Sequence, residues 1–248
     1  MKIGILGTGH IGKTLVRELS AAGHDVKVAN SRGPDTIEPD LLSSGARAVT
    51  TQEALQDVDA VILSIPLNRI ADVAPLVARL PEETVVIDTS NYYPFRDGRI
   101  DAIEAGQVES LWVAGQLGRP IAKAWNAIGS ASFATKGNPA GTPGRIAIPV
   151  AADRDRDREV ALALVEDTGL DAVYSGTLAD SWRQQPGAPA YCTDLNREEM
   201  GPALAAAERA RLPKRRDLGV EVMQERLGDG TTNPDADWGV RLVRAINM

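Results

Sequence analysis

The residues best suited to chemistry are three closely spaced glycines, in the run Gly7-Thr8-Gly9-His10-Ile11-Gly12. This run directly follows an apolar strand pattern at 2–6 and opens a helix pattern at 11–22, the context in which such a spacing binds a dinucleotide. The first glycine permits a tight turn, the second lets the backbone approach a pyrophosphate, and the third lets helix and strand pack closely. The free N–H groups of the helix would then face the anion. We expect all six residues to bind the cofactor; an ordinary glycine turn is the alternative.

The end of the second predicted strand, at 25–29, bears on which nicotinamide dinucleotide binds. A site for NAD usually places an acidic residue here, which holds the ribose 2′-hydroxyl. This chain has Asn30, Ser31 and Arg32 instead. All three can donate hydrogen bonds to a 2′-phosphate, and Arg32 adds a charge and a planar fork. The pattern therefore favours NADP(H) over NAD(H), with a plain polar turn as the alternative.

Two further loops should lie at the carboxyl edge of the sheet, where ligands bind in open α/β folds. The first, Ser64-Ile65-Pro66, follows a strand pattern at 59–64, and its proline would stiffen the backbone beside the nicotinamide. The second follows a strand pattern at 84–88 and contains Asn91, a candidate substrate contact. Both are also compatible with ordinary strand-to-helix connections.

No Ser-His-Asp set, metal cluster or pair of carboxylates stands out, and we expect no metal site. Hydride transfer between two stacked rings needs only their positioning and the exclusion of water. A carbonyl or imine acceptor would also need a proton donor. The candidates are Tyr191, Lys123 and His10, each with a purely structural role as the alternative.

The loop 182–192 contains two prolines, a glycine and polar side chains, which mark an ordered connection. Arg183 and Tyr191 in this loop are candidates for lining an acceptor pocket. A surface connection with Trp182 packed inward is the alternative. Cys192 fits a small buried residue better than a reactive thiol.

The elements that position these residues follow from the apolar pattern. Helices are expected at 11–22, 35–44, 68–80 and 156–168, and strands at 2–6, 25–29, 47–49, 59–64, 84–88, 121–125, 145–151 and 171–174. Short strands that are apolar on both faces and alternate with helices predict an α/β fold with a doubly wound, mostly parallel Rossmann sheet.

The pattern changes after residue 176. Helices are expected at 196–211 and 217–227, and a last helix carries Trp238, Leu242 and Ile246 on one face. We therefore expect an NADP-binding Rossmann domain at 1–176 and a small, mainly helical C-terminal cap and substrate region at 177–248. The apolar stripe of the last helix makes a homodimer plausible; docking on its own domain is the alternative.

Composition limits the other classes of function. The chain has 248 residues and a net charge of −7, with one cysteine and two histidines. One cysteine excludes a disulfide framework, and the acidic balance disfavours binding to nucleic acid. The basic run at 209–216 is interleaved with acids and fits a solvated face. No apolar run reaches the roughly 18–20 residues that span a bilayer, and the N-terminus enters a strand pattern at once. We expect a cytoplasmic protein without a membrane partner.

Taken together, three segments resemble the F420-dependent NADP oxidoreductase family: the glycine run at 7–12, the strand end at 30–32, and Lys123-Ala124-Trp125-Asn126. The resemblance covers about residues 1–130. Other Rossmann enzymes share the first segment, whereas the combination is more specific. The resemblance implies an NADPH site that crosses the sheet edge and includes Asn126, and a smaller C-terminal part that closes over the nicotinamide. In the name-giving enzymes the acceptor is the deazaflavin F420, but many members have no assigned acceptor.

The predicted function is that of an NADPH-dependent oxidoreductase, with hydride transfer between the nicotinamide and F420, a flavin or another small organic acceptor. A carbonyl or imine reductase is one alternative. A redox-sensing or regulatory NADP(H)-binding protein without turnover is another, because catalytic side chains are lacking. A 3-hydroxyacid dehydrogenase would use a lysine on a long helix of a larger second domain. The only lysine beyond position 136 is Lys214, in a solvated run.

Overall fold

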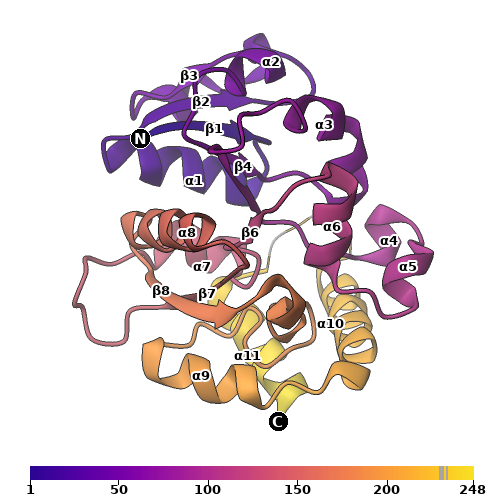
Figure 1. The fold of residues 1–248 in the computed structure, drawn as a ribbon. Coiled ribbons are helices and arrows are strands. Elements are labelled where there is room, and N and C mark those ends of the chain that lie inside the picture. The colour runs from indigo at the N-terminus through magenta and orange to yellow at the C-terminus, as the bar shows by residue number, and fades with distance from the viewer. Residues whose placement is uncertain (229–231, 233) are drawn as a thin grey trace.

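The computed structural model describes residues 1–228, 232 and 234–248, which form an eight-stranded sheet with helices on both faces (Figure 1). The strand order is β3-β2-β1-β4-β5-β6-β7-β8, and only the β6–β7 pair is antiparallel within this part of the chain. The strands are β1 (Lys2–Leu6), β2 (Asp25–Ala29), β3 (Arg47–Ala48), β4 (Ala60–Leu63), β5 (Val85–Asp88), β6 (Ala122–Lys123), β7 (Ala147–Ala152) and β8 (Asp171–Gly176). The predicted fold class is confirmed.

The strands are buried on both faces because their apolar side chains alternate between two cores. In β4, Ile62 belongs to one core, whereas Val61 and Leu63 belong to the other. Residues of α1 (His10–Ala21), α7 (Ser130–Thr135) and α8 (Asp155–Asp167) complete the first core. Residues of α2 (Thr51–Ala54), α3 (Ile70–Val77) and α6 (Glu109–Leu117) complete the second. This two-sided burial is what a doubly wound sheet requires.

The helix predicted at 35–44 is wrong. The segment forms two short 3-10 turns, η1 (Pro34–Thr36) and η2 (Pro39–Leu42), instead. Glu38, between them, is extended at φ −60° and ψ 129°. A residue that precedes proline is disfavoured in the helical region, and Pro39 offers no N–H for a helical bond. The chain therefore breaks at Glu38.

Several other helices differ from the prediction. Between β5 and β7 the structure adds α4 (Pro94–Asp97), α5 (Asp101–Glu104), α6 and α7, none of which the pattern indicated. The helix predicted at 68–80 begins as a 3-10 turn, η3 (Leu67–Arg69), and continues as α3. The helix predicted at 196–211 stops early and divides into α9 (Arg197–Ala205) and η5 (Arg209–Arg211). The next helix, α10 (Leu212–Leu227), begins five residues before the predicted 217, with Pro213 in its first turn, where a missing N–H costs nothing.

The region after β8 is helical and folds back against the sheet (Figure 1). It begins with η4 (Leu178–Gln184) and continues through α9, which packs on β7 and β8 through Met200 and Leu204. α10 and the last helix, α11 (Ala236–Asn247), pack on each other. The division of the chain at 176/177 stays a prediction. No helix among the described residues has the length and apolar character needed to cross a membrane.

The apolar stripe of α11 contacts the same chain. A Cβ at Gly219 of α10 would lie 3.6 Å from Cδ1 of Ile246, and Arg226 of α10 lies over the Trp238 ring at 4.9 Å. These contacts agree with the alternative in which the stripe docks on its own domain. The homodimer stays a prediction.

Candidate cofactor and acceptor site

The glycine run forms the turn between β1 and α1, and its glycines have different structural roles. Gly7 has a φ of +111°, and a Cβ there would lie 2.1 Å from the carbonyl oxygen of Ser64. A Cβ at Gly12 would lie 2.1 Å from the carbonyl oxygen of Gly7. A Cβ at Gly9 would meet nothing within 4 Å. Gly7 and Gly12 are therefore required for packing, whereas Gly9 leaves open space at the start of α1.

This open space fits a pyrophosphate. α1 has 12 residues, and its first turn lacks both an acidic side chain and a side-chain cap at Gly9. The first N–H groups of the helix are thus left for an external acceptor, and the helix dipole favours a negative charge there. Both the cradle that a Cβ would fill and the uncapped helix start suit the phosphates of a dinucleotide.

The end of β2 lies beside this turn, because the Gly7 N–H donates to the Ala29 carbonyl at 2.8 Å. Asn30 Oδ1 accepts a hydrogen bond from the Arg32 N–H at 2.9 Å, and Asn30 Nδ2 donates to Thr36 Oγ1 at 3.0 Å. Ser31 and Arg32 are exposed. The Arg32 guanidinium has no ion-pair partner among the described residues, so its charge is available next to the glycine run.

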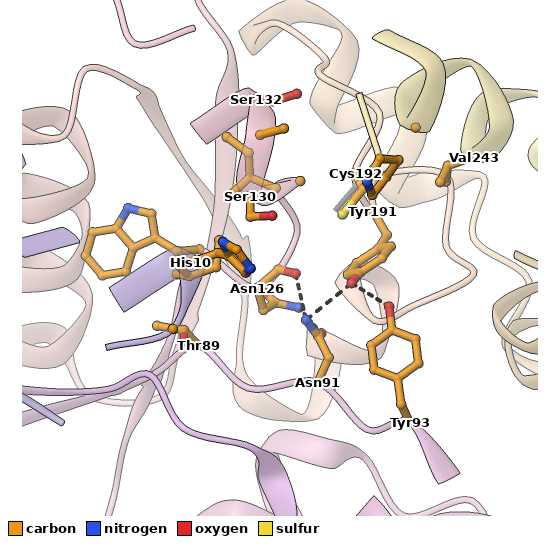
Figure 2. Close-up of a pocket in the computed structure, with 18 of the residues that line it drawn as sticks. His10, Thr89, Asn91, Tyr93, Asn126, Ser130, Ser132, Tyr191, Cys192 and Val243 are labelled. Atoms are coloured by element: carbon orange, nitrogen blue, oxygen red, sulfur yellow. Dashed lines mark hydrogen bonds between the residues drawn. The ribbon is translucent and has the colours of Figure 1, made fainter. Parts of the chain in front are cut away.

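A cavity of about 410 Å³ lies between the carboxyl edge of the sheet and the C-terminal helices (Figure 2). Its lining brings together many of the predicted site residues: Gly9, His10, Ile11, Ser64, Ile65, Pro66, Asn91, Asn126 and Tyr191. α11 supplies part of the opposite wall, including Val243. The cavity thus continues from the start of α1 towards the C-terminal region.

A network of side-chain amides fixes one wall of the cavity (Figure 2). Asn126 Nδ2 donates to Asn91 Oδ1 at 3.0 Å, and Asn91 Nδ2 donates to the Asn126 carbonyl at 2.9 Å. Gln184 is fully buried, and its Nε2 donates to Asn126 Oδ1 at 2.9 Å. The amide of Asn126 is therefore held from two sides, so it lines the cavity in one orientation.

Two tyrosine hydroxyls meet on the same side of the cavity. Tyr93 Oη and Tyr191 Oη lie 2.7 Å apart, and Asn91 Nδ2 donates to Tyr191 Oη at 3.4 Å (Figure 2). Burial raises the pKa of Tyr191 well above its ordinary value, and burial likewise raises the pKa of Tyr93. Both phenols therefore stay protonated at neutral pH, and the pair can offer one O–H to a ligand.

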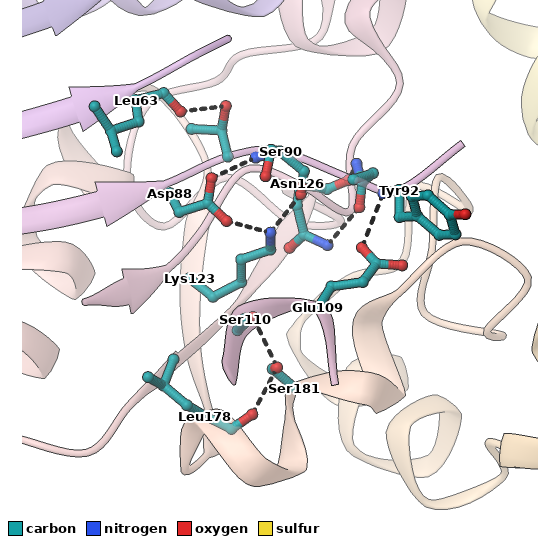
Figure 3. Close-up of polar contacts among 12 residues, drawn as sticks. Leu63, Asp88, Ser90, Tyr92, Glu109, Ser110, Lys123, Asn126, Leu178 and Ser181 are labelled. Atoms are coloured by element: carbon teal, nitrogen blue, oxygen red, sulfur yellow. Dashed lines mark hydrogen bonds and ion pairs between the residues drawn. The ribbon is translucent and has the colours of Figure 1, made fainter. Parts of the chain in front are cut away.

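Lys123 does not reach the cavity, and its assignment as a candidate proton donor is corrected. Its side chain is fully buried, with Nζ 2.6 Å from Asp88 Oδ2 and in contact with the Ser90 carbonyl (Figure 3). Asp88 Oδ1 also accepts from the Ser90 N–H at 3.0 Å. Lys123 therefore fixes the end of β5. Ser90 lines the cavity, and its buried Oγ has no hydrogen-bond partner among the described residues.

Glu109, in α6, is another buried titratable group, and it contacts the segment that follows β5 (Figure 3). Its Oε2 accepts a hydrogen bond from the Tyr92 N–H at 3.0 Å. Burial raises the pKa of Glu109 to about 7, although the nearby charges of Lys123 and Arg216 act in the opposite direction. This carboxyl supports the 88–92 segment and titrates near neutral pH.

Only part of the loop 182–192 lines the cavity. The Arg183 guanidinium stacks on the Trp182 ring at 4.6 Å and does not line the cavity, so its assignment to the acceptor pocket is corrected. Cys192 does line it, but burial raises the pKa of this thiol to about 12, so the thiol stays protonated. This agrees with a non-reactive cysteine.

The sequence pattern placed the loop of Ser90 and Tyr93 at the ligand-binding edge but singled out only Asn91 in it, and it gave no sign that Trp125 lines the cavity. Tyr93 and Ser90 follow β5 at the carboxyl edge, so the edge rule that selected Asn91 also applied to them. Trp125 has a φ of +55°, a strained conformation for a residue other than glycine. This turn directs Asn126 into the amide network, and no sequence pattern indicated it.

Comparison with known proteins supports the predicted resemblance. Residues 2–92 match the family model described as NADP oxidoreductase, coenzyme F420-dependent. Protein YjhV of Escherichia coli K12 is 47% identical over 79 residues, which are 30% of this chain and 58% of YjhV. The matched segment therefore spans less than two thirds of that relative.

Solved structures share the fold over most of the chain. The hypothetical protein SMa0349 of Sinorhizobium meliloti superposes with a TM-score of 0.68 at 27% identity, covering 79% of this chain and 96% of that one. A protein of Arthrobacter sp. FB24, assigned as an F420-dependent NADP-reductase, gives a TM-score of 0.57 at 16% identity, with 94% and 97% covered. The 3-hydroxyisobutyrate dehydrogenase of Mycobacterium tuberculosis superposes with a TM-score of 0.51 at 20% identity, and the match covers 92% of this chain and 66% of that one. At these identities the last two show the fold alone.

Proposed function

We propose that the chain is an NADPH-dependent oxidoreductase, because residues 2–92 match the family model of the F420-dependent NADP oxidoreductases. In this reaction a hydride passes between the nicotinamide and F420, a flavin or another small organic acceptor. The observation that carries the proposal is that one continuous cavity joins Gly9, at the start of α1, to the hydroxyl pair of Tyr93 and Tyr191.

Different groups of residues bind different parts of the cofactor. The N–H groups of the glycine run hold the pyrophosphate, and Asn30, Ser31 and Arg32 hold the 2′-phosphate. The Ser64–Pro66 loop borders the nicotinamide, and Ser90 Oγ and the fixed amide of Asn126 are the polar groups that face its carboxamide. When bound, the dihydronicotinamide supplies the hydride, and the protein positions it and excludes water.

A flavin-like ring can accept the hydride without a proton donor, whereas an acceptor that becomes basic on gaining the hydride also needs a proton. Tyr191 supplies it from Oη, which is protonated at neutral pH. The resulting phenolate is stabilised by the Tyr93 hydroxyl at 2.7 Å and by the Asn91 amide at 3.4 Å. The same pair would serve a carbonyl or imine acceptor, which needs such a donor most, so that reaction is our second candidate.

The proposal also covers the surroundings of the reaction. We propose that the partner of the protein is a small-molecule redox acceptor, and that the protein binds neither nucleic acid nor a membrane. We also propose that it acts in the cytoplasm. The net charge of −7 supports the exclusion of nucleic acid. A homodimer remains compatible with this function.

The preference for NADPH is tested with Arg32→Ala. Losing a charge-assisted hydrogen bond costs about 1.5–3 kcal/mol, so the Kd for NADPH should rise roughly 10- to 100-fold in calorimetric titration. The Kd for NADH should change less than about twofold, since NADH has no 2′-phosphate. Arg17→Ala, at an exposed position of α1 and 3.7 Å from Asp40, is the matched control and should change neither. Equal losses for both dinucleotides would overturn the assignment of Arg32.

A further inference from the structure

A second cavity, of about 250 Å³, adjoins the first. It lies between α10, α11 and the segment 93–96. Tyr93, Arg96, Tyr191 and Met223 line both cavities, so a ligand that touches the tyrosine pair can extend into the second one.

The charge of the second cavity is unlike that of the whole chain. Three arginines line it, Arg96, Arg215 and Arg216, whereas no described lining residue is an aspartate or glutamate. The chain as a whole has a net charge of −7. Much of the rest of the lining is apolar, including Val220, Met223 and Ile246. A local excess of guanidinium groups within an acidic protein indicates an anionic ligand.

The three arginines differ in how far their charge is already paired. Arg96 is neutralised by the buried Asp97, at 2.8 and 2.9 Å, and also donates to the Asn91 carbonyl. Arg216 donates from Nε to Asp217 at 2.7 Å, and Arg215 donates from Nη2 to Glu208 at 3.1 Å. Both of these carboxylates are more than half exposed. Water weakens the two pairs, so an anion in the cavity can compete with both carboxylates.

Among the three arginines, Arg215 gives the strongest indication of an anionic ligand. The prediction of a solvated face is wrong here, because Arg215 is only 7% exposed and Arg216 9%. Even so, Nε and Nη1 of Arg215 have no hydrogen-bond partner among the described residues. Leaving buried guanidinium N–H groups unpaired costs free energy, and such groups in a folded protein usually await a ligand or an ordered water. A carboxylate or a phosphate would accept from Nε or Nη1, each of which forms a bidentate edge together with Nη2.

We infer that the second cavity binds an anionic group, a carboxylate or a phosphate, of the hydride acceptor, an inference that rests on the proposed function. The reacting end of the acceptor lies beside Tyr191 in the first cavity. Its apolar body contacts the α10 and α11 side chains, and its acidic end pairs with Arg215 and Arg216.

The test measures binding and needs no turnover. The full chain is first saturated with NADP⁺, so that the glycine run and Arg32 are occupied, and is then titrated calorimetrically with benzoate, phenyl phosphate and neutral benzamide. At least one anion should bind tenfold or more tightly than benzamide, and whichever of the two binds tighter identifies the group as carboxylate or phosphate. If neither anion binds more tightly than benzamide, the inference is overturned.

Variants then locate the anion. Arg215→Gln and Arg216→Gln should each reduce the advantage of the anion over benzamide to below about threefold. Arg211→Gln is the matched control, because Arg211 pairs with the same Glu208 but is 59% exposed and lies outside the cavity. It should keep the full advantage. An advantage that survives in both glutamine variants would refute the site.

Two further readouts keep the result interpretable. Thermal melting of each variant checks folding, and Arg215→Lys, which retains the charge without the fork, replaces the glutamine variant if that one unfolds. The lysine variant should lose most of the advantage for the bidentate anion, and full retention would count against the pairing. Failure of the proposed function would instead appear as absent NADP⁺ binding in the first titration, whatever the anions do.

Discussion

The glycine run offers a test that separates binding from folding, through matched alanine substitutions at Gly9 and Gly12. At Gly9 the backbone is extended, with φ −72°, and the added Cβ meets nothing within 4 Å. Replacing glycine at a compatible position stabilises by about 0.4–1 kcal/mol, and losing a glycine at an N-cap costs a similar amount. Gly9→Ala should therefore change the free energy of unfolding by less than about 0.5 kcal/mol.

At Gly12 the same methyl group would lie 2.1 Å from the Gly7 carbonyl oxygen. Overpacking costs about 1–3 kcal/mol, and the clash is with backbone that cannot rotate away, so the upper end applies. A gain of about 1 kcal/mol in helix propensity offsets part of this cost. Gly12→Ala should therefore destabilise the protein by about 2 kcal/mol or more.

The assay combines urea denaturation with NADPH titration of each variant. Gly9→Ala should keep wild-type stability and raise the Kd for NADPH at least tenfold, because its methyl group occupies the space that the pyrophosphate needs. Gly12→Ala should instead show its main effect as a lower free energy of unfolding. The reasoning is refuted if Gly9→Ala binds NADPH as tightly as the wild type, or if Gly9→Ala is the less stable variant.

Two other predictions concern the buried groups. Burial places the pKa of Glu109 at about 7 in the folded chain against 4.5 in the unfolded one, so the wild type loses stability as the pH rises from about 4.5 through 7. With 1.36 kcal/mol per pKa unit, Glu109→Gln should gain about 2.5 kcal/mol relative to the wild type between pH 5 and 8.5 in urea denaturation, and a pH-independent difference would contradict this. Tyr191→Phe should lower kcat for NADPH oxidation roughly 100-fold and leave the Kd for NADPH unchanged. An unaltered kcat would remove Tyr191 as the proton donor.

Much of the fold could be predicted because its signals are local. Strands such as Ala60–Leu63 are continuous apolar runs, and the glycines that join β1 to α1 have a spacing with a direct steric meaning. The helix expected at 35–44 failed at Pro39, whose missing N–H outweighs the apolar pattern. α4 and α5 have only four residues each, too few to show a helical period.

The site was predictable only along the edge of the sheet. Asn91 follows β5, so the strand pattern placed it, whereas Asn126, which follows β6, was indicated by the family resemblance. Tyr93 and Tyr191 are 98 residues apart, and only the folding of the C-terminal region over the sheet brings them together. Lys123 looked available for chemistry, but a strand position gives no sign that Asp88 pairs with its ammonium below the cavity.

The most direct test of the account is an experimental structure of the protein with NADP⁺ bound. We expect the pyrophosphate at Gly9, the 2′-phosphate at Arg32, and the nicotinamide ring between the Ser64–Pro66 loop and Asn126, with one face open towards Tyr191. A dinucleotide bound elsewhere, or a nicotinamide directed away from the cavity, would contradict it.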